Sequence, residues 1–443
     1  MDLSLLGAAE AASALAEGRI SSEELVAACL ERIKIDEERV QAWTYIDPEY
    51  ALSQARAVDL MRREGKALGP LHGLPVGIKD IIDTEDMPTE DGTVLHTGRT
   101  PSEDATLVSM LRAAGAIIMG KTVTTELATY SPGKTRNPIN PEHTPGGSSS
   151  GSAAAVAARM VPLAIGTQTN GSVIRPAAYC GVVGYKPSFG LISRHGVLKQ
   201  SRPLDQIGVM ARSVEDVALL AEQLIGYDEN DPDTRPRARP KLREIAMQEP
   251  PLPPTLAFVK SPIWKQADAQ CRDAFAELTA HLGERVEEFK LPDGFKNAWK
   301  WQQTIMEADL AKNFEPEYQN GRDKLSETLR SQIERGRKVR AVDYNKALDQ
   351  IPALNSALNH LFELRYEAII TPATAGTAPK GLESTGSPAF CTLWTLCGLP
   401  AITLPLMQGE DGLPLGVQLV GPRGSDARLL RTARWLLAQV QSD

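Results

Sequence analysis

Short apolar runs of strand length recur along this chain of 443 residues, and segments with helical periodicity separate them. The strand-like runs lie at about 76–78, 116–119, 163–165, 256–259, 285–289, 366–372, 401–404 and 415–420. The helical segments lie at about 106–114, 153–160, 266–282, 296–363 and 389–397, with a last helix from Ser425. Alternation of this kind predicts an α/β fold in which helices cover a buried sheet.

The composition excludes several classes of protein. The net charge is −8 and there is no long run of Lys or Arg, so we expect no nucleic-acid partner. The five cysteines form no CxxC pair, which argues against a disulfide framework or a zinc site and fits the reducing cytoplasm. We therefore expect no metal and no cofactor, and a small molecule as the partner.

Two apolar stretches lack the features of membrane-directed segments. The N-terminus has no basic residue before its apolar stretch and reads as two helices, the second with Ser21 or Ser22 as its N-cap. The uncharged run 384–409 is long enough for a membrane span, but glycines and prolines interrupt it at 386, 388, 398, 400 and 405. We expect neither a signal peptide nor a membrane span. The proline-rich stretch Asp228–Pro254 is interpreted as a surface connection between two halves of one fold.

The segment Thr144–Ser152, TPGGSSSGS, is interpreted as a functional loop. A flexible linker is the alternative, but the helix-forming sequence AAAVAARM follows at once. Glycines and serines between two ordered elements present backbone N–H groups and hydroxyls at short range.

A second candidate is the segment Gly166–Gly181, GTQTNGSVIRPAAYCG. It leaves an apolar strand, turns through Asn170 and Gly171, and is predicted to enter a short helix with Pro176 near its start. A serine on such a turn, here Ser172, exposes its hydroxyl among backbone N–H groups, as in a nucleophile elbow. A structural N-cap serine remains the alternative at this stage.

A nucleophilic serine needs a base. None of the six histidines stands in a recognisable triad setting, although spacing alone does not exclude one. Lys79 directly follows an apolar strand, and a desolvated lysine favours its neutral form and accepts a proton. A solvated lysine is the alternative, and the flanking residues Ile78 and Ile81 weaken that alternative without deciding the matter.

The stretch Gly115–Thr122, GAIIMGKT, matches the phosphate-loop pattern GxxxxGK[ST]. A phosphate cradle needs small or polar residues between its glycines, whereas the residues here are apolar and read as a strand. Nucleotide binding is kept as a competing function from another class, which stabilisation by ATP with Mg²⁺ would reveal.

Several segments resemble, in order, those of the amidase signature family. They include GPLHGLPVGIKDIIDT, DATLVSMLRAAGAIIMGKT, NPINPEHTPGGSSSGSAAAVAARMVPLAIGTQTNGS, SRPLDQIGVMARSVEDVALL, LCGLPAITLP and GLPLGVQLVG. The resemblance implies a single domain around a large mixed β-sheet covered by helices on both sides. Its parts would be N-terminal helices at 1–65, a signature core at 66–230, a variable, substrate-shaping helical region at about 240–365 and the rest of the core at 366–443.

The resemblance also implies the catalytic roles. Lys79 matches the family's lysine, Ser148 its bridging serine, preceded by a cis peptide bond, and Ser172 its nucleophile. Ser172 would form an acyl-enzyme, with a proton relay through Ser148 to Lys79. The oxyanion hole would consist of the backbone N–H groups of Thr169, Asn170, Gly171 and Ser172.

The nucleophile loop departs from the pattern Asp-x-Gly-Gly-Ser-Ile-Arg of many members. Gln168 stands for the acid, Asn170 for a glycine, and Arg175 comes one residue later. The order Ser-Val-Ile-Arg is similar to the malonamidase-like branch, in which the arginine meets a substrate carboxylate. We therefore hypothesise that Arg175 binds such a group, with a structural ion pair as the alternative. Tyr130, Asn170 and Arg175 are the predicted substrate-binding residues.

These observations predict an amidohydrolase that cleaves the C–N bond of a small, polar amide, with a carboxylate-bearing amide as one option. The alternative within the family is the amidase subunit of a tRNA-dependent amidotransferase, which would imply partner subunits. A homodimer stays open.

Overall fold

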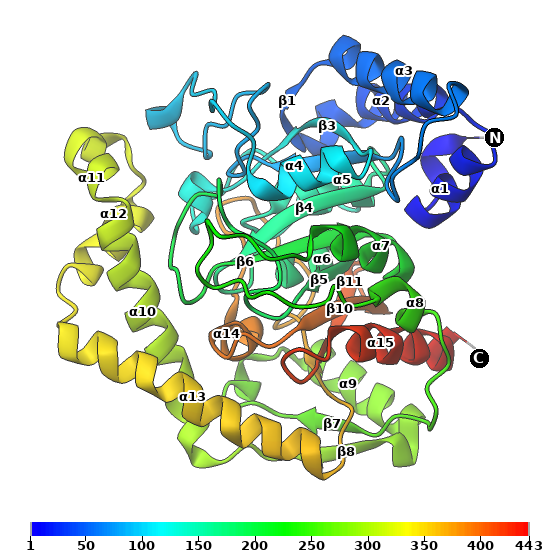
Figure 1. Ribbon diagram of the computed structural model, residues 1–443. Helices are drawn as coiled ribbons and strands as arrows, with labels where there is room; N and C mark the ends of the chain where they lie inside the picture. The colour runs from blue at the N-terminus through cyan, green and yellow to red at the C-terminus, as the bar shows by residue number, and fades with distance from the viewer. Residues whose placement is uncertain (1, 442–443) are drawn as a thin grey trace.

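One mixed sheet of eleven strands runs through the molecule, and helices pack against it (Figure 1). The computed structural model describes residues 2–441. The strand order is β1-β3-β2-β4-β6-β5-β10-β11-β9-β7-β8. The strands are β1 Trp43–Ile46, β2 Pro75–Lys79, β3 Ile117–Thr122, β4 Leu163–Gln168, β5 Val183–Lys186, β6 Gln206–Ala211, β7 Leu256–Val259, β8 Val286–Phe289, β9 Ala368–Pro372, β10 Ala401–Gln408 and β11 Pro414–Val420.

Fifteen α-helices accompany the sheet within the described residues. They are α1 Ala8–Ala16, α2 Ser22–Val40, α3 Pro48–Arg63, α4 Thr106–Ala113, α5 Ser150–Ala157, α6 Ile174–Cys180, α7 Val214–Leu224, α8 Leu242–Ala246, α9 Ala269–Leu282, α10 Ala298–Asn313, α11 Glu315–Gly321, α12 Glu327–Gly336, α13 Ala341–Leu364, α14 Ala389–Leu396 and α15 Asp426–Gln441. The predicted α/β fold is therefore confirmed. None of these helices is long and apolar enough to cross a membrane.

The central strand β4 shows why the sheet is covered on both faces. Leu163 and Ile165 belong to one buried apolar cluster and Ala164 to another, since successive side chains of a strand point to opposite faces. The strand is parallel to β2 and antiparallel to β6. The parallel pairing places the C-terminal ends of β2 and β4 at the same edge, which is where both strands release a functional segment.

Small residues let α5 lie close to the sheet. Its sequence is SGSAAAVA, and every residue from Ser150 to Val156 is buried. Gly151 is required by space, because a Cβ there would lie 2.2 Å from the carbonyl oxygen of Ala42. The glycine- and serine-rich segment is therefore ordered rather than a flexible linker, and the helix begins at Ser150, three residues before its predicted start.

The helices α10, α11, α12 and α13 form an arm at one side of the sheet (left and lower left in Figure 1). Helix α10 contacts α12, α13 and α14, so it joins the arm to the core. Gly336 allows a close crossing, since a Cβ there would lie 1.9 Å from the carbonyl oxygen of Glu307. The sequence predicted helices here but not their packing.

The segment with the phosphate-loop pattern is a buried strand. Residues 117–122 form β3, and Lys121 has no exposed surface. Its Nζ donates to the carbonyl oxygen of Ile82 at 2.6 Å and to Thr89 Oγ1 at 2.6 Å. A lysine held in this way does not reach a phosphate, so the geometry does not support the nucleotide-binding alternative.

Candidate active site

The ends of β2 and β4 bring a lysine to two hydroxyl groups. Lys79, the last residue of β2, has no exposed surface. Its Nζ donates to Ser148 Oγ at 2.7 Å and to Thr167 Oγ1 at 2.8 Å. Because both partners are neutral hydroxyls, neither compensates the charge of an ammonium group. The arrangement suits a lysine that works as a base.

The electrostatic setting of Lys79 supports that role. Burial lowers the pKa of Lys79 well below its usual value, and the charge of Asp205 opposes this change without cancelling it. The positive charge of Arg175 lowers the pKa further. The neutral form of the lysine is therefore favoured relative to a lysine in water, and the neutral amine accepts a proton.

The serines around Ser148 have other partners. Ser149 Oγ accepts from the backbone N–H of Thr167 at 3.2 Å, and Ser150 Oγ donates to the carbonyl oxygen of Gly146 at 2.8 Å. Ser152 Oγ donates to the carbonyl oxygen of Ile165 at 2.9 Å. The bonds of Ser149 and Ser152 attach the segment to β4, and that of Ser150 closes the loop on itself. Among the serines at 148–150, Ser148 is the one that contacts Lys79, and the peptide bond before it is cis.

Ser172 lies in the turn between β4 and α6. Gln168 Oε1 accepts from the backbone N–H groups of Val173 at 2.8 Å and Ile174 at 3.0 Å, which satisfies the first donors of the helix. By contrast, the backbone N–H groups of residues 169–172 donate to no described residue. The predicted oxyanion donors therefore have no partner among the described residues.

The hydroxyl of Ser172 is available to a substrate. The residue is 8% exposed, and its Oγ keeps some contact with solvent. This oxygen has no hydrogen-bond partner among the described residues. The backbone N–H of Ser149 donates to the carbonyl oxygen of Ser172 at 3.3 Å, so the loop of Ser148 lies against the turn. No hydrogen bond joins the hydroxyls of Ser148 and Ser172 within residues 2–441, and such bonds often form only in the substrate complex.

Asn170 fits its position without strain. Its φ is not positive, so the turn does not need a glycine there. Its Nδ2 donates to Tyr130 Oη at 3.0 Å, and its Oδ1 accepts from Thr392 Oγ1 at 2.7 Å. The structure thus brings together two of the three predicted substrate-binding residues.

Arg175, the third, is surrounded differently. It is 1% exposed, and its Nε and Nη2 donate to the carbonyl oxygen of Gly147 at 3.2 and 2.6 Å. Its Nη1 donates to the carbonyl oxygen of Gly386. The observed partners are backbone carbonyls that position the residue before Ser148. No acidic side chain is among these partners, so they do not form the structural ion pair that was the alternative. Carboxylate binding by Arg175 stays a prediction.

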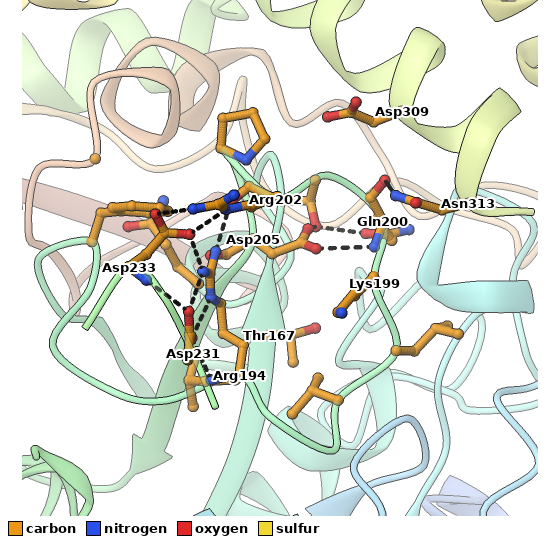
Figure 2. Close-up of a pocket in the computed structure, with 18 of the residues that line it drawn as sticks. Thr167, Arg194, Lys199, Gln200, Arg202, Asp205, Asp231, Asp233, Asp309 and Asn313 are labelled. Atoms are coloured by element: carbon orange, nitrogen blue, oxygen red, sulfur yellow. Dashed lines mark hydrogen bonds and ion pairs between the residues drawn. The ribbon is translucent and has the colours of Figure 1, made fainter. Parts of the chain in front are cut away.

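Two cavities adjoin the nucleophile loop. The larger, of about 980 Å³, is lined by Thr167 and Thr169, and also by Asp309 and Asn313 of α10 (Figure 2). The smaller, of about 330 Å³, is lined by Tyr130 and Asn170 together with residues of α10, α12 and α14. We call the smaller one the arm cleft. Sequence reasoning did not foresee either cavity, because each combines segments that are far apart in the chain.

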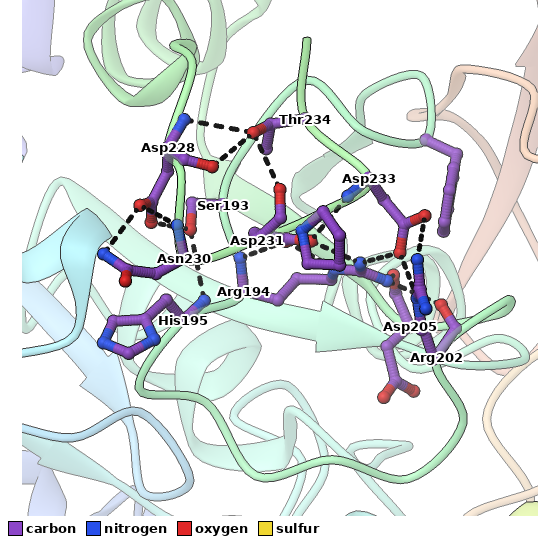
Figure 3. Close-up of polar contacts among 12 residues, drawn as sticks. Ser193, Arg194, His195, Arg202, Asp205, Asp228, Asn230, Asp231, Asp233 and Thr234 are labelled. Atoms are coloured by element: carbon purple, nitrogen blue, oxygen red, sulfur yellow. Dashed lines mark hydrogen bonds and ion pairs between the residues drawn. The ribbon is translucent and has the colours of Figure 1, made fainter.

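An ion-pair network forms one wall of the larger cavity (Figure 3). Arg194 bridges Asp231 at 2.7 Å and Asp233 at 2.5 Å, and Arg202 also pairs with Asp233 at 2.9 Å. The network fastens the loop around residue 231 to the core. All its charged groups are paired with each other, so we interpret it as structural.

The family follows from the whole chain. The profile of the family described as Amidase matches residues 24–430, which includes both functional segments. The chain belongs to the amidase signature family. It is therefore an amidohydrolase, as the sequence predicted.

Similar proteins extend over nearly the full length of this amidase. A glutamyl-tRNA(Gln) amidotransferase subunit from Symbiobacterium thermophilum is 34% identical, over 98% of this chain and 97% of its own. A solved protein reported with a vestigial complex and the origins of an s-triazine catabolic enzyme is 27% identical, with 98% of each chain covered and a TM-score of 0.91. The peptide amidase of Stenotrophomonas maltophilia is 30% identical, with 98% of this chain and 96% of its own chain covered and a TM-score of 0.83.

Proposed function

We propose that this amidase hydrolyses the C–N bond of a small, polar amide through an acyl-enzyme on Ser172, with Lys79 and Ser148 as the proton relay. The observation that carries the proposal is the 2.7 Å contact between Lys79 Nζ and Ser148 Oγ in a fully buried setting. A base of this kind activates a serine hydroxyl without a histidine.

The proposed reaction proceeds in two stages. Neutral Lys79 takes the proton of Ser148 as Ser148 takes that of Ser172, and Ser172 Oγ attacks the amide carbon. The backbone N–H groups of Thr169, Asn170, Gly171 and Ser172 donate to the oxyanion, and such a donor is worth about 3 kcal/mol in comparable sites. The proton then returns through Ser148 to the leaving nitrogen, and the C–N bond breaks. In the second stage water, activated by the same relay, releases the acid.

A second candidate function is that of the amidase component in a tRNA-dependent amidotransferase. It is favoured by the name of the relative from Symbiobacterium thermophilum, at 34% identity over nearly the full length. In that case the substrate would be glutamine, and ammonia would pass to a partner protein. Both candidates use the same serine chemistry, so they differ in substrate and in dependence on partners.

Ammonia release by the purified chain alone tests the proposal. We expect hydrolysis of small aliphatic amides, and a fall of at least about 10³-fold in kcat/KM for Ser172→Ala with an unchanged melting temperature. Retained activity in Ser172→Ala would refute the mechanism. Activity on glutamine alone, and only after partner proteins are added, would establish the second candidate instead.

A further inference from the structure

The arm cleft lies beside the nucleophile. Asn170, which lines it, is two residues before Ser172. Pro388, which also lines it, packs on the same turn, because a Cβ on Gly171 would lie 2.9 Å from Pro388 Cβ. A substrate whose amide carbon reaches Ser172 therefore has its remaining groups within reach of this cleft.

The charged groups of the cleft neutralise each other. Glu307 accepts from Arg335 Nη2 at 2.6 Å and from Arg335 Nε at 3.0 Å. Gln303 Nε2 also donates to Glu307, at 3.1 Å. Arg335 is the one cation among the described residues that line the cleft. A substrate carboxylate would therefore have to compete with Glu307 for it.

One polar side chain of the cleft has no partner among the described residues. Gln332 is 3% exposed, and its Oε1 is sealed from solvent without a hydrogen bond to any of them. No hydrogen bond of its Nε2 is found among these residues either. A buried amide oxygen left without a partner is costly, so a glutamine at such a place calls for an explanation.

The helix that carries Gln332 shows that packing alone does not require it. The buried face of α12 consists of Leu329, Gln332, Ile333 and Gly336, a spacing at which an apolar residue would pack by default. The helix start is anchored to the core, because Glu126 Oε1 accepts from the backbone N–H of Ser326 at 3.0 Å. The start of α12 is thus fixed, and Gln332 lies at the wall of the cleft.

We propose that Gln332 determines specificity by pairing with a second, uncharged amide or urea group of the substrate, which refines the substrate class of the proposed hydrolase and rests on that function. An amide side chain offers one donor and one acceptor edge. The group that matches both edges is another planar amide or urea. The oxygen and nitrogen of a glutamine are interchangeable by rotation, so the pairing works in either orientation. Tyr130 Oη already accepts from Asn170, and its own hydrogen, which bonds to none of residues 2–441, can donate to the same substrate.

Matched substrates test the proposal. They are malonamide, succinamide and glutaramide, the corresponding amide-acids in which one amide is a carboxylate, glutamine, and butyramide, which has no second polar group. We expect the wild-type enzyme to hydrolyse a diamide with a higher kcat/KM than the corresponding amide-acid. The diamide length with the highest kcat/KM indicates the separation between Ser172 and Gln332.

Variants at Gln332 separate binding from folding. We expect Gln332→Leu to raise KM for the best diamide about 10- to 100-fold with little change in kcat, and to change kcat/KM for butyramide less than about threefold. Gln332→Arg should shift preference towards the amide-acid of the same length. Gln319→Leu, an exposed change on α11 outside the cleft, is the matched control and should behave like wild type.

The outcomes are distinct. Equal effects of Gln332→Leu on diamide and butyramide, or a wild-type preference for amide-acids or glutamine, would overturn the role of Gln332. A wild-type enzyme that hydrolyses no amide of the panel, or a Ser172→Ala variant that keeps its activity, would instead refute the proposed function. Thermal melting checks folding, and we expect Gln332→Leu to melt no lower than wild type, since it removes a buried amide without partners.

Discussion

The proposed relay and the arm cleft differ in how they are built. Lys79 and Thr167 stand on adjacent parallel strands, and the hydroxyls around them bond to strand or loop groups. The arm cleft combines α10 and α12 of the arm with the buried helix α14, and it contains a partly exposed ion pair and an amide oxygen that has no partner among the described residues. Proton transfer requires fixed distances between donor and acceptor, which neighbouring strands provide. Substrate choice tolerates variation in the residues that line the binding cleft. If the proposals for Ser172 and Gln332 hold, reaction type and substrate are set by separate parts of this fold.

The largest expected effect comes from removing the base. Lys79→Met should lower kcat/KM at least about 10³-fold while the melting temperature stays the same or rises, because a buried lysine without an opposite charge is unfavourable. Steady-state rates and thermal melts measure this. An active Lys79→Met enzyme would show that the relay is assigned wrongly.

The matched control is Lys121→Met on the neighbouring strand. Lys121 is equally buried but lies 3.9 Å from Asp80, which the change would leave unpaired. We expect the reverse pattern: a loss of about 3 kcal/mol in stability and kcat per folded molecule within about tenfold of wild type. If both lysine variants lost activity equally, burial rather than the Ser148 contact would explain the effect.

The rate of the wild-type enzyme should also depend on pH through Lys79. Protonation of the base removes its lone pair, so kcat/KM should fall as the pH drops through the lowered pKa of Lys79. The acid limb should therefore lie well below the ordinary lysine value, and a limb near that value would contradict the buried geometry.

A smaller effect is expected from Arg175, which tests whether it belongs to the relay or to substrate binding. Arg175→Met leaves the carbonyl oxygen of Gly147 without its donors, which costs about 1–3 kcal/mol of stability. We expect kcat to fall about 10- to 100-fold for neutral and carboxylated amides alike. A rise in KM confined to carboxylated amides would support the carboxylate-binding hypothesis instead.

The smallest effect is expected where the arm meets the core. His96 lies between Asp91 at 2.8 Å and Glu317 of α11 at 3.1 Å, and these hydrogen bonds raise the pKa of His96 to about 9. Burial raises the pKa of Asp91 at the same time. The attraction between His96 and Asp91 is therefore weaker than the raised pKa of His96 alone suggests. The folded pKa exceeds the unfolded value, so the stabilisation is complete below about pH 6.5 and is lost as the pH rises through 9.

His96→Gln tests this contact. It should lower the free energy of unfolding by about 1–2 kcal/mol at pH 6 and by less at pH 10, with kcat unchanged. Denaturant titrations at the two pH values measure it. An equal loss at both would mean that the charge of His96 contributes nothing.

The fold class and the candidate segments could be predicted because their signals are local, whereas the catalytic roles were implied by the family resemblance. The strand lengths, the glycines and serines at 144–152 and the turn before Ser172 follow from periodicity and backbone freedom over a few residues. The strands β1, β5 and β6 were not predicted. They are four to six residues long, and strands this short depend on partners far along the chain.

The sequence by itself determined an α/β chain with an ordered serine loop, a serine on a strand-to-helix turn and a lysine at the end of a buried strand. Only the tertiary structure decided that Lys79 meets Ser148, that Arg175 turns to the carbonyl of Gly147, and that Gln332 lines the same cleft as Asn170, with an amide oxygen that has no partner among the described residues. The physical reason is range. Backbone preference acts between neighbours, whereas burial, pairing and the lowered pKa of Lys79 arise from segments that only folding brings together.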